Sequence, residues 1–120
     1  MNLRTGIDSV EIARFVGKEE KFIRKILTDG EIDYYRAKGS KPQTLAGLFA
    51  AKEAFLKMLG TGIFSGIGFS EVAVGHDEDG RPFYSLGKNA EKALLSLGLS
   101  SVDLSITHTD SVATAICVGF

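Results

Sequence analysis

The segment FAAKEAFLKMLGTG, Phe49–Gly62, decides the fold prediction. Its large apolar side chains have helical spacing, and the Gly-Thr-Gly at its end terminates the helix. Three charged residues, Lys52, Glu53 and Lys57, interrupt this otherwise apolar helix. They either line a solvated helix face or form the floor of a polar site, and the rest of the sequence has to distinguish the two.

The helix extends backwards to about Pro42, because proline is favoured in the first helical turn. It should run forwards to Leu59, with Gly60 as its end. Ser40 and Gln43 have the spacing of a capping box at its start. We therefore predict one long helix over about 42–59, against which the other elements pack.

Glu53 lies on the same side of this helix as Phe49 and several small residues that suit close approach by another element. We expect its carboxylate to be at least partly buried, and a buried ionised carboxylate needs a partner. Lys57, one turn further on, is the expected partner. Taken alone, the helix favours the simpler alternative, an ordinary Glu–Lys pair on a solvated face.

Gly60-Thr61-Gly62 follows the helix and presents backbone N–H groups and a hydroxyl close to Lys57, in a loop that a phosphate can approach. It is not a P-loop, because it follows a helix instead of opening one. Gly60 is also an ordinary helix end, so the loop by itself gives weak support for a phosphate site.

The composition is typical of one globular domain spanning residues 1–120, with 44% hydrophobic and 24% charged residues. A chain of this size buries a core but has little left to enclose a deep cleft, which favours a site between subunits. The net charge of −1 argues against a general nucleic-acid-binding protein.

The single cysteine, Cys117, lies in the apolar run AICV and is expected to be a buried spectator in a reducing compartment. The N-terminal MNLRTGIDSVE lacks the apolar region of a signal peptide. No apolar run approaches the roughly 20 residues of a membrane span. We therefore predict a cytoplasmic protein with no membrane partner.

The segments around the long helix divide into helices first and strands later. We expect a first strand in LRTGID that stops at Asp8, then helices in VEIARFV and KEEKFIRKIL. A capping box, Thr28–Glu31, should open another helix that ends at Gly39. After the long helix, we expect a hairpin of FSEVAVG and RPFYSL around HDEDG, a helix in KNAEKALLSL, and strands VDLSITHT and VATAICVG. This order predicts an α+β fold, with a largely antiparallel sheet packed on the long central helix and additional short helices.

Asp8 and His108 are further candidates for chemistry. Asp8 either caps the helix that follows it or reaches a ligand over the sheet edge. With Glu53 it would supply two hard oxygen ligands, and Mg²⁺ is usually held by such carboxylates together with waters and substrate phosphates. His108 lies at the end of a strand beside Thr109, which favours a core-edge residue but also allows a phosphate contact. His76, in the acidic turn, is expected at the surface, and the sequence has no zinc pattern.

Several motifs in register resemble a known family. Together they are similar to the bacterial holo-acyl-carrier-protein synthases, the small trimeric type of 4′-phosphopantetheinyl transferase, and the resemblance covers essentially the whole chain. The motifs are GIDSVEI at Gly6–Ile12, KILTDGE at Lys25–Glu31, LAGLFAAKEAFLKMLGTG at Leu45–Gly62, GRPF at Gly80–Phe83 and SITHTDSVATA at Ser105–Ala115.

The resemblance implies transfer of the phosphopantetheine arm of coenzyme A to a serine of apo acyl carrier protein, releasing adenosine 3′,5′-bisphosphate, in fatty acid biosynthesis. It implies Asp8 and Glu53 as Mg²⁺ ligands, and Asp8, Glu53 and Lys57 as the catalytic residues. It implies active sites between the subunits of a homotrimer. The residues expected near coenzyme A are Lys57, Gly60, Thr61, Gly62, Gly80, Arg81, Pro82, His108 and Thr109.

The sequence departs from the family at one position, since many members carry an arginine after the LAG of the long helix, where this chain has Leu48. If that arginine contacts a coenzyme phosphate, binding here has to depend on other cations.

The carrier-protein partner should be acidic, and basic residues with helical spacing offer a matching surface, provided that the helix continues past Gly17. These residues are Arg14, Lys18, Lys21 and Lys25. A solvated charged face is the usual meaning of such a pattern.

Two other classes of function stay open. One is a non-catalytic module that binds coenzyme A or a nucleotide, and the other is an adaptor for acidic proteins. Neither class needs Asp8, Glu53, Lys57 and His108 together, so their coincidence favours the enzyme.

Overall fold

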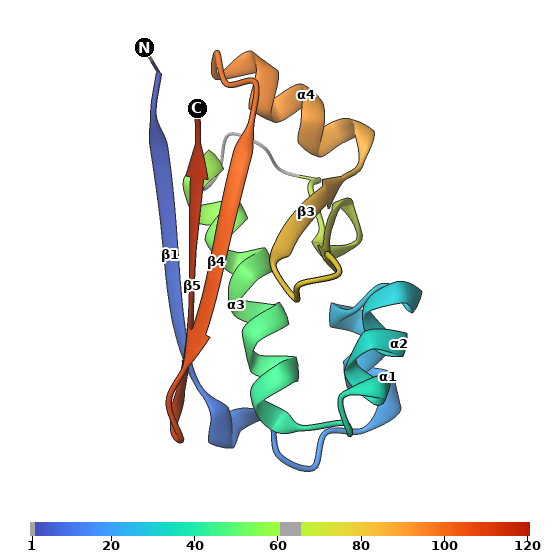
Figure 1. Ribbon diagram of the computed structural model, residues 1–120. Coiled ribbons are helices and arrows are strands. Elements are labelled where there is room, and N and C mark those ends of the chain that lie inside the picture. The colour runs from blue at the N-terminus through green and yellow to red at the C-terminus, as the bar shows by residue number, and fades with distance from the viewer. Residues whose placement is uncertain (1, 61–65) are drawn as a thin grey trace.

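The computed structural model describes residues 2–60 and 66–120, and Figure 1 shows the arrangement of its elements. The chain forms an α+β fold, as predicted. Its elements are β1 (Arg4–Glu11), η1 (Ile12–Phe15), α1 (Glu20–Ile26), α2 (Asp29–Ala37), α3 (Pro42–Leu59), η2 (Phe69–Glu71), β2 (Val72–His76), β3 (Pro82–Leu86), α4 (Lys88–Ser96), β4 (Val102–His108) and β5 (Val112–Gly119).

The strands form two antiparallel sheets. In the three-stranded sheet, β5 lies between β1 and β4 and is antiparallel to both, while β2 and β3 form the predicted hairpin. Strand β3 lies beside β4 without joining its sheet, so the hairpin forms a separate layer next to α3 (Figure 1). The two chain ends lie close together at the same end of the three-stranded sheet (Figure 1).

The first strand is longer than predicted. It continues through Asp8 to Glu11, because β5 supplies backbone partners along that whole stretch, from Asp8 opposite Ala115 to Glu11 opposite Val112. Within β1, buried residues alternate with exposed ones, and Asp8 is on the buried side. Asp8 therefore lies inside a strand. The simpler of the two interpretations, that Asp8 caps a following helix, is wrong.

Helix α3 has the predicted bounds, Pro42–Leu59. Pro42 occupies the first turn and Gly60 ends the helix with a φ of 91°, a conformation that glycine adopts at little cost. The predicted capping box at Ser40 is wrong: Lys41 is the residue before the helix, and no side chain caps it. The opposite end is capped by Arg4 of β1, whose guanidinium donates to the carbonyl oxygens of Met58 and Leu59 at 2.8 and 3.3 Å.

Helix α3 packs directly on the inner face of the three-stranded sheet (Figure 1). Gly6 permits this close approach, because a Cβ atom there would overlap the carbonyl oxygen of Ala54 and lie 2.6 Å from the backbone nitrogen of Met58. The backbones of β1 and α3 therefore meet with no side chain between them. This contact brings the middle of β1 against the second half of α3.

Lys52 of α3 is fully buried, and its ammonium group has three partners. It lies 2.7 Å from Oε1 of Glu31 and donates to the carbonyl oxygens of Phe69 and Val72, each at 3.0 Å. Burial lowers the pKa of Lys52, whereas the charge of Glu31 raises it. Of the three charges in the opening segment, this one is part of the core.

Glu31 belongs to the predicted capping box at the start of α2, which the structure confirms. Thr28 accepts a hydrogen bond from the backbone of Glu31, and Oε1 of Glu31 accepts one from the backbone of Thr28 at 2.7 Å. The same carboxylate also accepts from the backbone N–H of Val74 in β2 at 2.7 Å. One side chain therefore joins α2 to α3 and to the hairpin.

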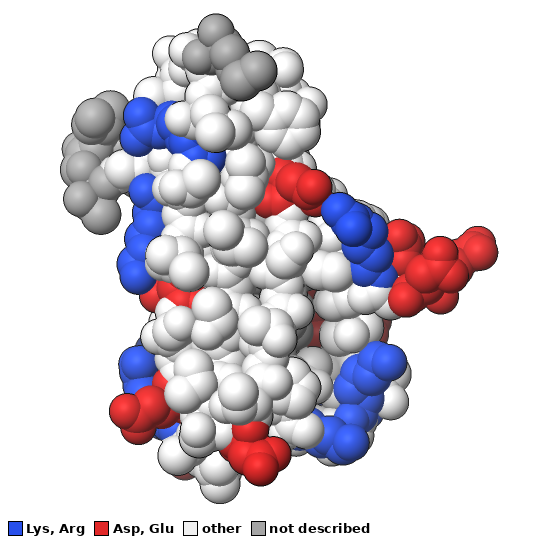
Figure 2. Space-filling view, turned by 60° about the vertical axis from the view of Figure 1, so that its left-hand side comes forward, with Lys and Arg blue, Asp and Glu red and all other residues white. Residues whose placement is uncertain are grey.

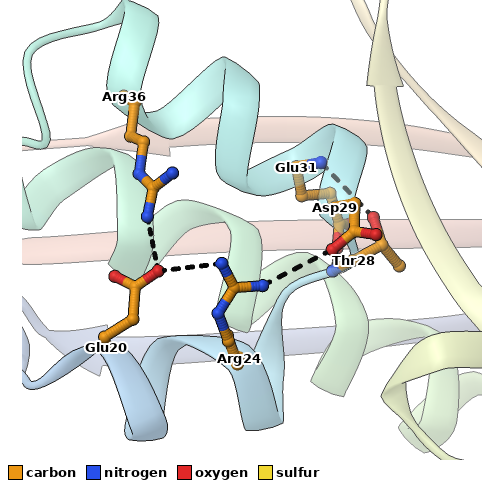
Figure 3. A network of polar contacts seen from close by, with 6 residues as sticks. All are labelled: Glu20, Arg24, Thr28, Asp29, Glu31 and Arg36. Carbon is orange, nitrogen blue, oxygen red and sulfur yellow. Dashed lines mark hydrogen bonds and ion pairs between the residues drawn. The ribbon is translucent and has the colours of Figure 1, made fainter.

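Of the two helices predicted before α2, the one in KEEKFIRKIL forms as α1, whereas VEIARFV ends β1 and forms only the 3-10 turn η1. A short 3-10 turn, η1, is followed by Gly17 with a φ of 68°, and only then does α1 begin. Figure 3 shows how exposed ion pairs connect α1 to α2: Glu20 pairs with Arg24 and with Arg36, and Arg24 also approaches Asp29. Because these side chains are about half exposed or more, each pair stabilises the fold by less than about 1 kcal/mol.

Cys117 is buried in the sheet, as predicted, and burial raises the pKa of its thiol to about 12. Within residues 2–60 and 66–120, no helix has the length and apolar character needed to cross a membrane.

Candidate active site

Asp8, Glu53 and Lys57 meet where β1 crosses α3. The Nζ atom of Lys57 lies 2.7 Å from Oδ1 of Asp8. The lysine therefore pairs with Asp8 of β1, and the predicted pair of Lys57 with Glu53 is wrong. The Asp8 side chain is only 11% exposed, whereas that of Lys57 is 50% exposed. The pair thus joins a buried carboxylate to an ammonium group that still faces solvent.

The second carboxylate oxygen of Asp8, Oδ2, is buried, and no group in the described part of the chain donates a hydrogen bond to it. A buried carboxylate oxygen without a partner is costly, because it has lost its water and gained nothing in return. This oxygen is therefore a point at which a bound cation would be stabilised.

Glu53 is half-buried and lies one helical turn before Lys57. Burial raises the pKa of Glu53, and the negative charge of Asp8 raises it further, while Lys57 acts in the opposite direction. The two carboxylates are therefore close enough to repel each other. A cation held by both carboxylates would relieve this repulsion.

The residues present suit a magnesium ion. Mg²⁺ prefers oxygen ligands and commonly takes one or two protein carboxylates, with waters and phosphate oxygens completing its shell. Asp8 supplies an unpartnered oxygen and Glu53 a second carboxylate. No cluster of three or more His, Cys, Asp or Glu side chains occurs among the described residues, which does not favour a closed protein cage.

His108 is not part of this cluster. It lies at the exposed end of β4, and the central strand β5 separates it from β1. Two strand spacings place its backbone roughly 10 Å or more from Asp8. The hydroxyl of the adjacent Thr109 accepts hydrogen bonds from the backbone of Ser111 and Val112, so it shapes the turn between β4 and β5.

The GRP segment borders a hollow of about 200 Å³ between the hairpin, α2 and α3. Leu48, the residue at which the sequence departs from the family, is part of its wall. Arg81 does not line it, since its guanidinium lies 3.2 Å from both carboxylate oxygens of Asp103. The lining residues are Tyr34, Gln43, Thr44, Gly47, Leu48, His76, Gly80, Pro82 and Ile106.

His76 is half-buried, which corrects the prediction that it lies at the surface. Its ring stacks on that of Tyr34, with centroids 3.8 Å apart and planes inclined by 3°. Burial and the positive charge of Lys38 lower the pKa of His76, while Asp77 and Glu31 oppose that change. The stack forms one wall of the hollow, and no local pattern in the sequence predicts it, because the two residues come from α2 and β2.

The basic residues predicted for carrier docking do not share one helical face, because Gly17 interrupts the helix. Arg14 and Lys18 nevertheless border an apolar hollow of about 420 Å³. Their charged groups lie over the rings of Phe15 and Phe22, respectively. Lys21 and Lys25 are exposed on α1. The apolar residues of this hollow, called the aromatic groove below, are Phe15, Phe22, Ile26, Phe49 and Phe69.

Of the predicted phosphate loop, Gly60 is described and uses its N–H group to close the helix, bonding the carbonyl oxygens of Leu56 and Lys57. Thr61 and Gly62 lie outside the described residues.

A protein-family model described as the 4′-phosphopantetheinyl transferase superfamily matches residues 4–117 of this chain. The chain belongs to the 4′-phosphopantetheinyl transferase superfamily. A holo-[acyl-carrier-protein] synthase from Halothermothrix orenii is 42% identical over 118 residues, covering 95% of this chain and 94% of the relative. This agreement over nearly the full length identifies the chain as an enzyme of the holo-[acyl-carrier-protein] synthase type.

Solved structures of the same superfamily share the fold. That of a holo-[acyl-carrier-protein] synthase from Neisseria meningitidis is 33% identical, with a TM-score of 0.86, and the match covers 98% of this chain and 97% of that one. The Helicobacter pylori protein, solved in complex with coenzyme A, is 30% identical with a TM-score of 0.82, and the match covers 97% and 99% of the two chains. The α+β prediction and the family resemblance are thus both confirmed.

Proposed function

We propose that this phosphopantetheinyl transferase moves the 4′-phosphopantetheine group of coenzyme A onto a serine of apo acyl carrier protein and releases adenosine 3′,5′-bisphosphate, with a requirement for Mg²⁺. The observation that carries the proposal is the buried, unpartnered oxygen of Asp8 beside Glu53 and Lys57. The Helicobacter pylori relative, solved with coenzyme A, supports this donor.

The reaction is attack of a serine hydroxyl on the β-phosphorus of the coenzyme's pyrophosphate. Transfers of this kind gain mostly from positioning and from neutralising charge on the phosphoryl oxygens. When bound by Asp8 and Glu53, Mg²⁺ would supply that neutralisation at the pyrophosphate. Lys57, at the solvent-facing edge of the cluster, offsets charge on the departing phosphate.

Glu53 is the residue that we assign as the acceptor of the serine proton, directly or through a water. It is the carboxylate of the cluster that makes no ion pair or hydrogen bond with Lys57 among the described residues, so it is available to accept a proton. Its place on a rigid helix, held against β1 by the backbone contact at Gly6, keeps the carboxylate in position.

The hollow beside the GRP segment is the proposed site for part of the coenzyme. Gly80 and Pro82 line it, as the family resemblance implies. Because Leu48 contributes no charge there, phosphate binding has to use other groups. We assign that role to Lys57, His108 and Thr109. Arg81 is paired with Asp103 and would have to leave this partner to bind a phosphate.

We further propose a homotrimer with active sites between its subunits. Figure 2 shows the outward face of the three-stranded sheet as a wide uncharged surface with charges at its margins. Ile7 and Ile116 lie opposite each other on this face and are 58% and 39% exposed, and Ser9 bonds Thr114 two residues further along the same strands. A second copy placed against the sheet would also allow its His108 to complete the cluster that one chain lacks.

The acidic partner, acyl carrier protein, would dock at the aromatic groove, where Arg14 and Lys18 flank the partly buried rings of Phe22, Phe49 and Phe69. Carrier helices that combine acidic and apolar residues suit such a surface. We place the reaction in the cytoplasm and in fatty acid biosynthesis, in keeping with the buried, unpaired Cys117.

The test is to incubate the enzyme with coenzyme A and apo carrier protein and to weigh the carrier by intact mass spectrometry. We expect a gain of one phosphopantetheine that requires Mg²⁺, is lost in Glu53→Gln and is kept in Glu91→Gln, an exposed matched control on α4. Coenzyme binding without any transfer would instead favour a binding module. Carrier binding that is unchanged by coenzyme A and Mg²⁺, with no transfer, would favour an adaptor for acidic proteins.

A further inference from the structure

We propose that Lys57 is a displaceable cation: its ammonium group neutralises Asp8 in the metal-free enzyme, and a divalent cation that binds Asp8 and Glu53 releases it toward the donor's phosphates. This inference rests on the proposed magnesium site. It assigns Lys57 two successive partners, of which the structure shows the first.

The need for a cation follows from the burial of Asp8. Its side chain is 11% exposed, and one of its oxygens has no partner in the described residues. An ionised carboxylate in such a place requires a compensating charge. The 2.7 Å contact with the Nζ atom of Lys57 supplies that charge when no metal is bound.

Lys57 is able to leave because half of its side chain is exposed. Its ammonium group sits on a flexible stem and is strongly hydrated in water, so moving it outward replaces the contact with Asp8 by hydration. Lys52, five residues earlier on the same helix, shows the contrast. It is fully buried and bound to Glu31 and two carbonyl oxygens, so moving it would break three contacts and leave these buried partners without a donor.

Displacement follows from charge. Asp8 and Glu53 would hold the divalent cation, whose charge would neutralise Asp8 in place of Lys57 and would repel an ammonium group on the same carboxylate. The released lysine has its backbone fixed at the end of α3, so it stays within reach of anything bound at the two carboxylates. Metal binding would therefore deliver a second positive charge to the donor.

The test uses stability and metal affinity, measured without coenzyme A or carrier protein. Wild type, Lys57→Met, Asp8→Asn and the double variant are unfolded with urea, once in a chelator and once in saturating Mg²⁺. Lys41→Met is the matched control, because Lys41 precedes the opposite end of α3, about 24 Å away along the helix axis.

In the chelator, Lys57→Met should lower the unfolding midpoint, since it leaves Asp8 uncompensated. In Mg²⁺ this difference should shrink to less than half, and Lys57→Met should bind Mg²⁺ roughly three- to tenfold more tightly than wild type, because a competing cation has been removed. Lys41→Met should change neither quantity. Asp8→Asn should abolish the effect of Mg²⁺ and the effect of Lys57→Met.

An equal loss of stability in the chelator and in Mg²⁺ would show that Lys57 stays on Asp8 when metal is bound, and would overturn the proposal. Weaker Mg²⁺ binding by Lys57→Met would do the same. If Mg²⁺ does not shift the midpoint of the wild type at all, the metal site itself is wrong, and displacement falls with it.

Discussion

The Nζ atom of Lys52 lies 2.7 Å from Oε1 of Glu31, and both side chains are almost completely shielded from solvent. The pair connects α3 to the first turn of α2, and its remaining hydrogen-bonding groups are used by Thr28, Phe69, Val72 and Val74. It therefore orders one side of α3 while the active-site charges occupy another.

Removing one partner of this pair should be strongly destabilising. Lys52→Met leaves the Glu31 carboxylate buried without its cation, and we expect the free energy of unfolding to fall by about 3–5 kcal/mol in urea titrations at neutral pH. The double variant Glu31→Gln/Lys52→Met should lose less than the sum of the single variants. Arg24→Met, in the exposed pair with Glu20, is the control and should cost less than about 1 kcal/mol. Equal losses at the two sites would contradict this account.

Gly6→Ala should destabilise the protein and disturb the carboxylate cluster. The new Cβ would overlap the Ala54 carbonyl oxygen, so β1 and α3 would have to separate, at a cost of at least about 1–3 kcal/mol. Mg²⁺ should also protect this variant against unfolding less than it protects wild type. Gly30→Ala is the matched control, since a Cβ there meets nothing within 4 Å. A Gly6→Ala protein as stable as the control would show that the packing is looser than described.

The stack of His76 on Tyr34 predicts a pH-dependent contribution to stability. Burial lowers the pKa of His76, so the unfolded chain takes up its proton at a higher pH than the folded one. The contribution is complete above the ordinary histidine pKa of about 6.5 and is lost as the pH falls from there through the lowered value. His76→Phe keeps a ring without the titration. Its urea midpoint should therefore decline less than that of wild type between neutral pH and about pH 5, and parallel declines would count against the stack.

Arg14→Ala should weaken carrier binding more than coenzyme binding. We expect the KM for apo carrier protein to rise several-fold, with the KM for coenzyme A unchanged, and the effect should diminish as salt screens the surface. Lys92→Ala, an exposed lysine on α4, is the control. A carrier KM that is unaltered at low salt would remove Arg14 from the docking surface.

Ile116→Lys should separate the subunits, because it places a charge on the central strand of the outward sheet face. Light scattering should then report a smaller particle than wild type, and transferase activity should fall with it if the sites lie between subunits. Leu95→Lys changes an apolar residue that is 65% exposed on α4 and should leave the particle unchanged. An assembly that survives Ile116→Lys would mean that the copies meet elsewhere.

The parts of the fold that were predictable are those governed by neighbours in sequence. Pro42 and Gly60 mark the ends of α3, and Thr28 with Glu31 marks the start of α2, because first-turn proline, capping boxes and C-terminal glycines act within a few residues. The failed capping box at Ser40 shows the limit of such signals, since a spacing alone does not determine which residue precedes the helix.

The errors arose where distant segments meet. Helical spacing predicts Glu53 as the partner of Lys57, but its partner is Asp8, 49 residues away. The local pattern predicts a first strand that stops at Asp8, whereas its extension to Glu11 depends on pairing with β5, at the other end of the chain. The burial of Lys52 likewise depends on Glu31, Phe69 and Val72, none of which lies within a turn of it. Asp8 and Glu53 were identified only as a hypothetical pair, and their spatial proximity required the fold.

The missing side chain at Gly6 has a consequence for how the protein tolerates change. Because backbone is in contact with backbone there, the smallest possible distance between β1 and α3 is set by main-chain atoms and does not depend on side-chain conformation. Substitutions that swell or shrink the core elsewhere can tilt α2, α4 or the hairpin while leaving this spacing alone. Asp8 is on β1 and Glu53 is on α3, so the two carboxylates would keep their separation when residues elsewhere in the core are substituted. The geometry of the reaction centre would then depend little on how the rest of the core is packed.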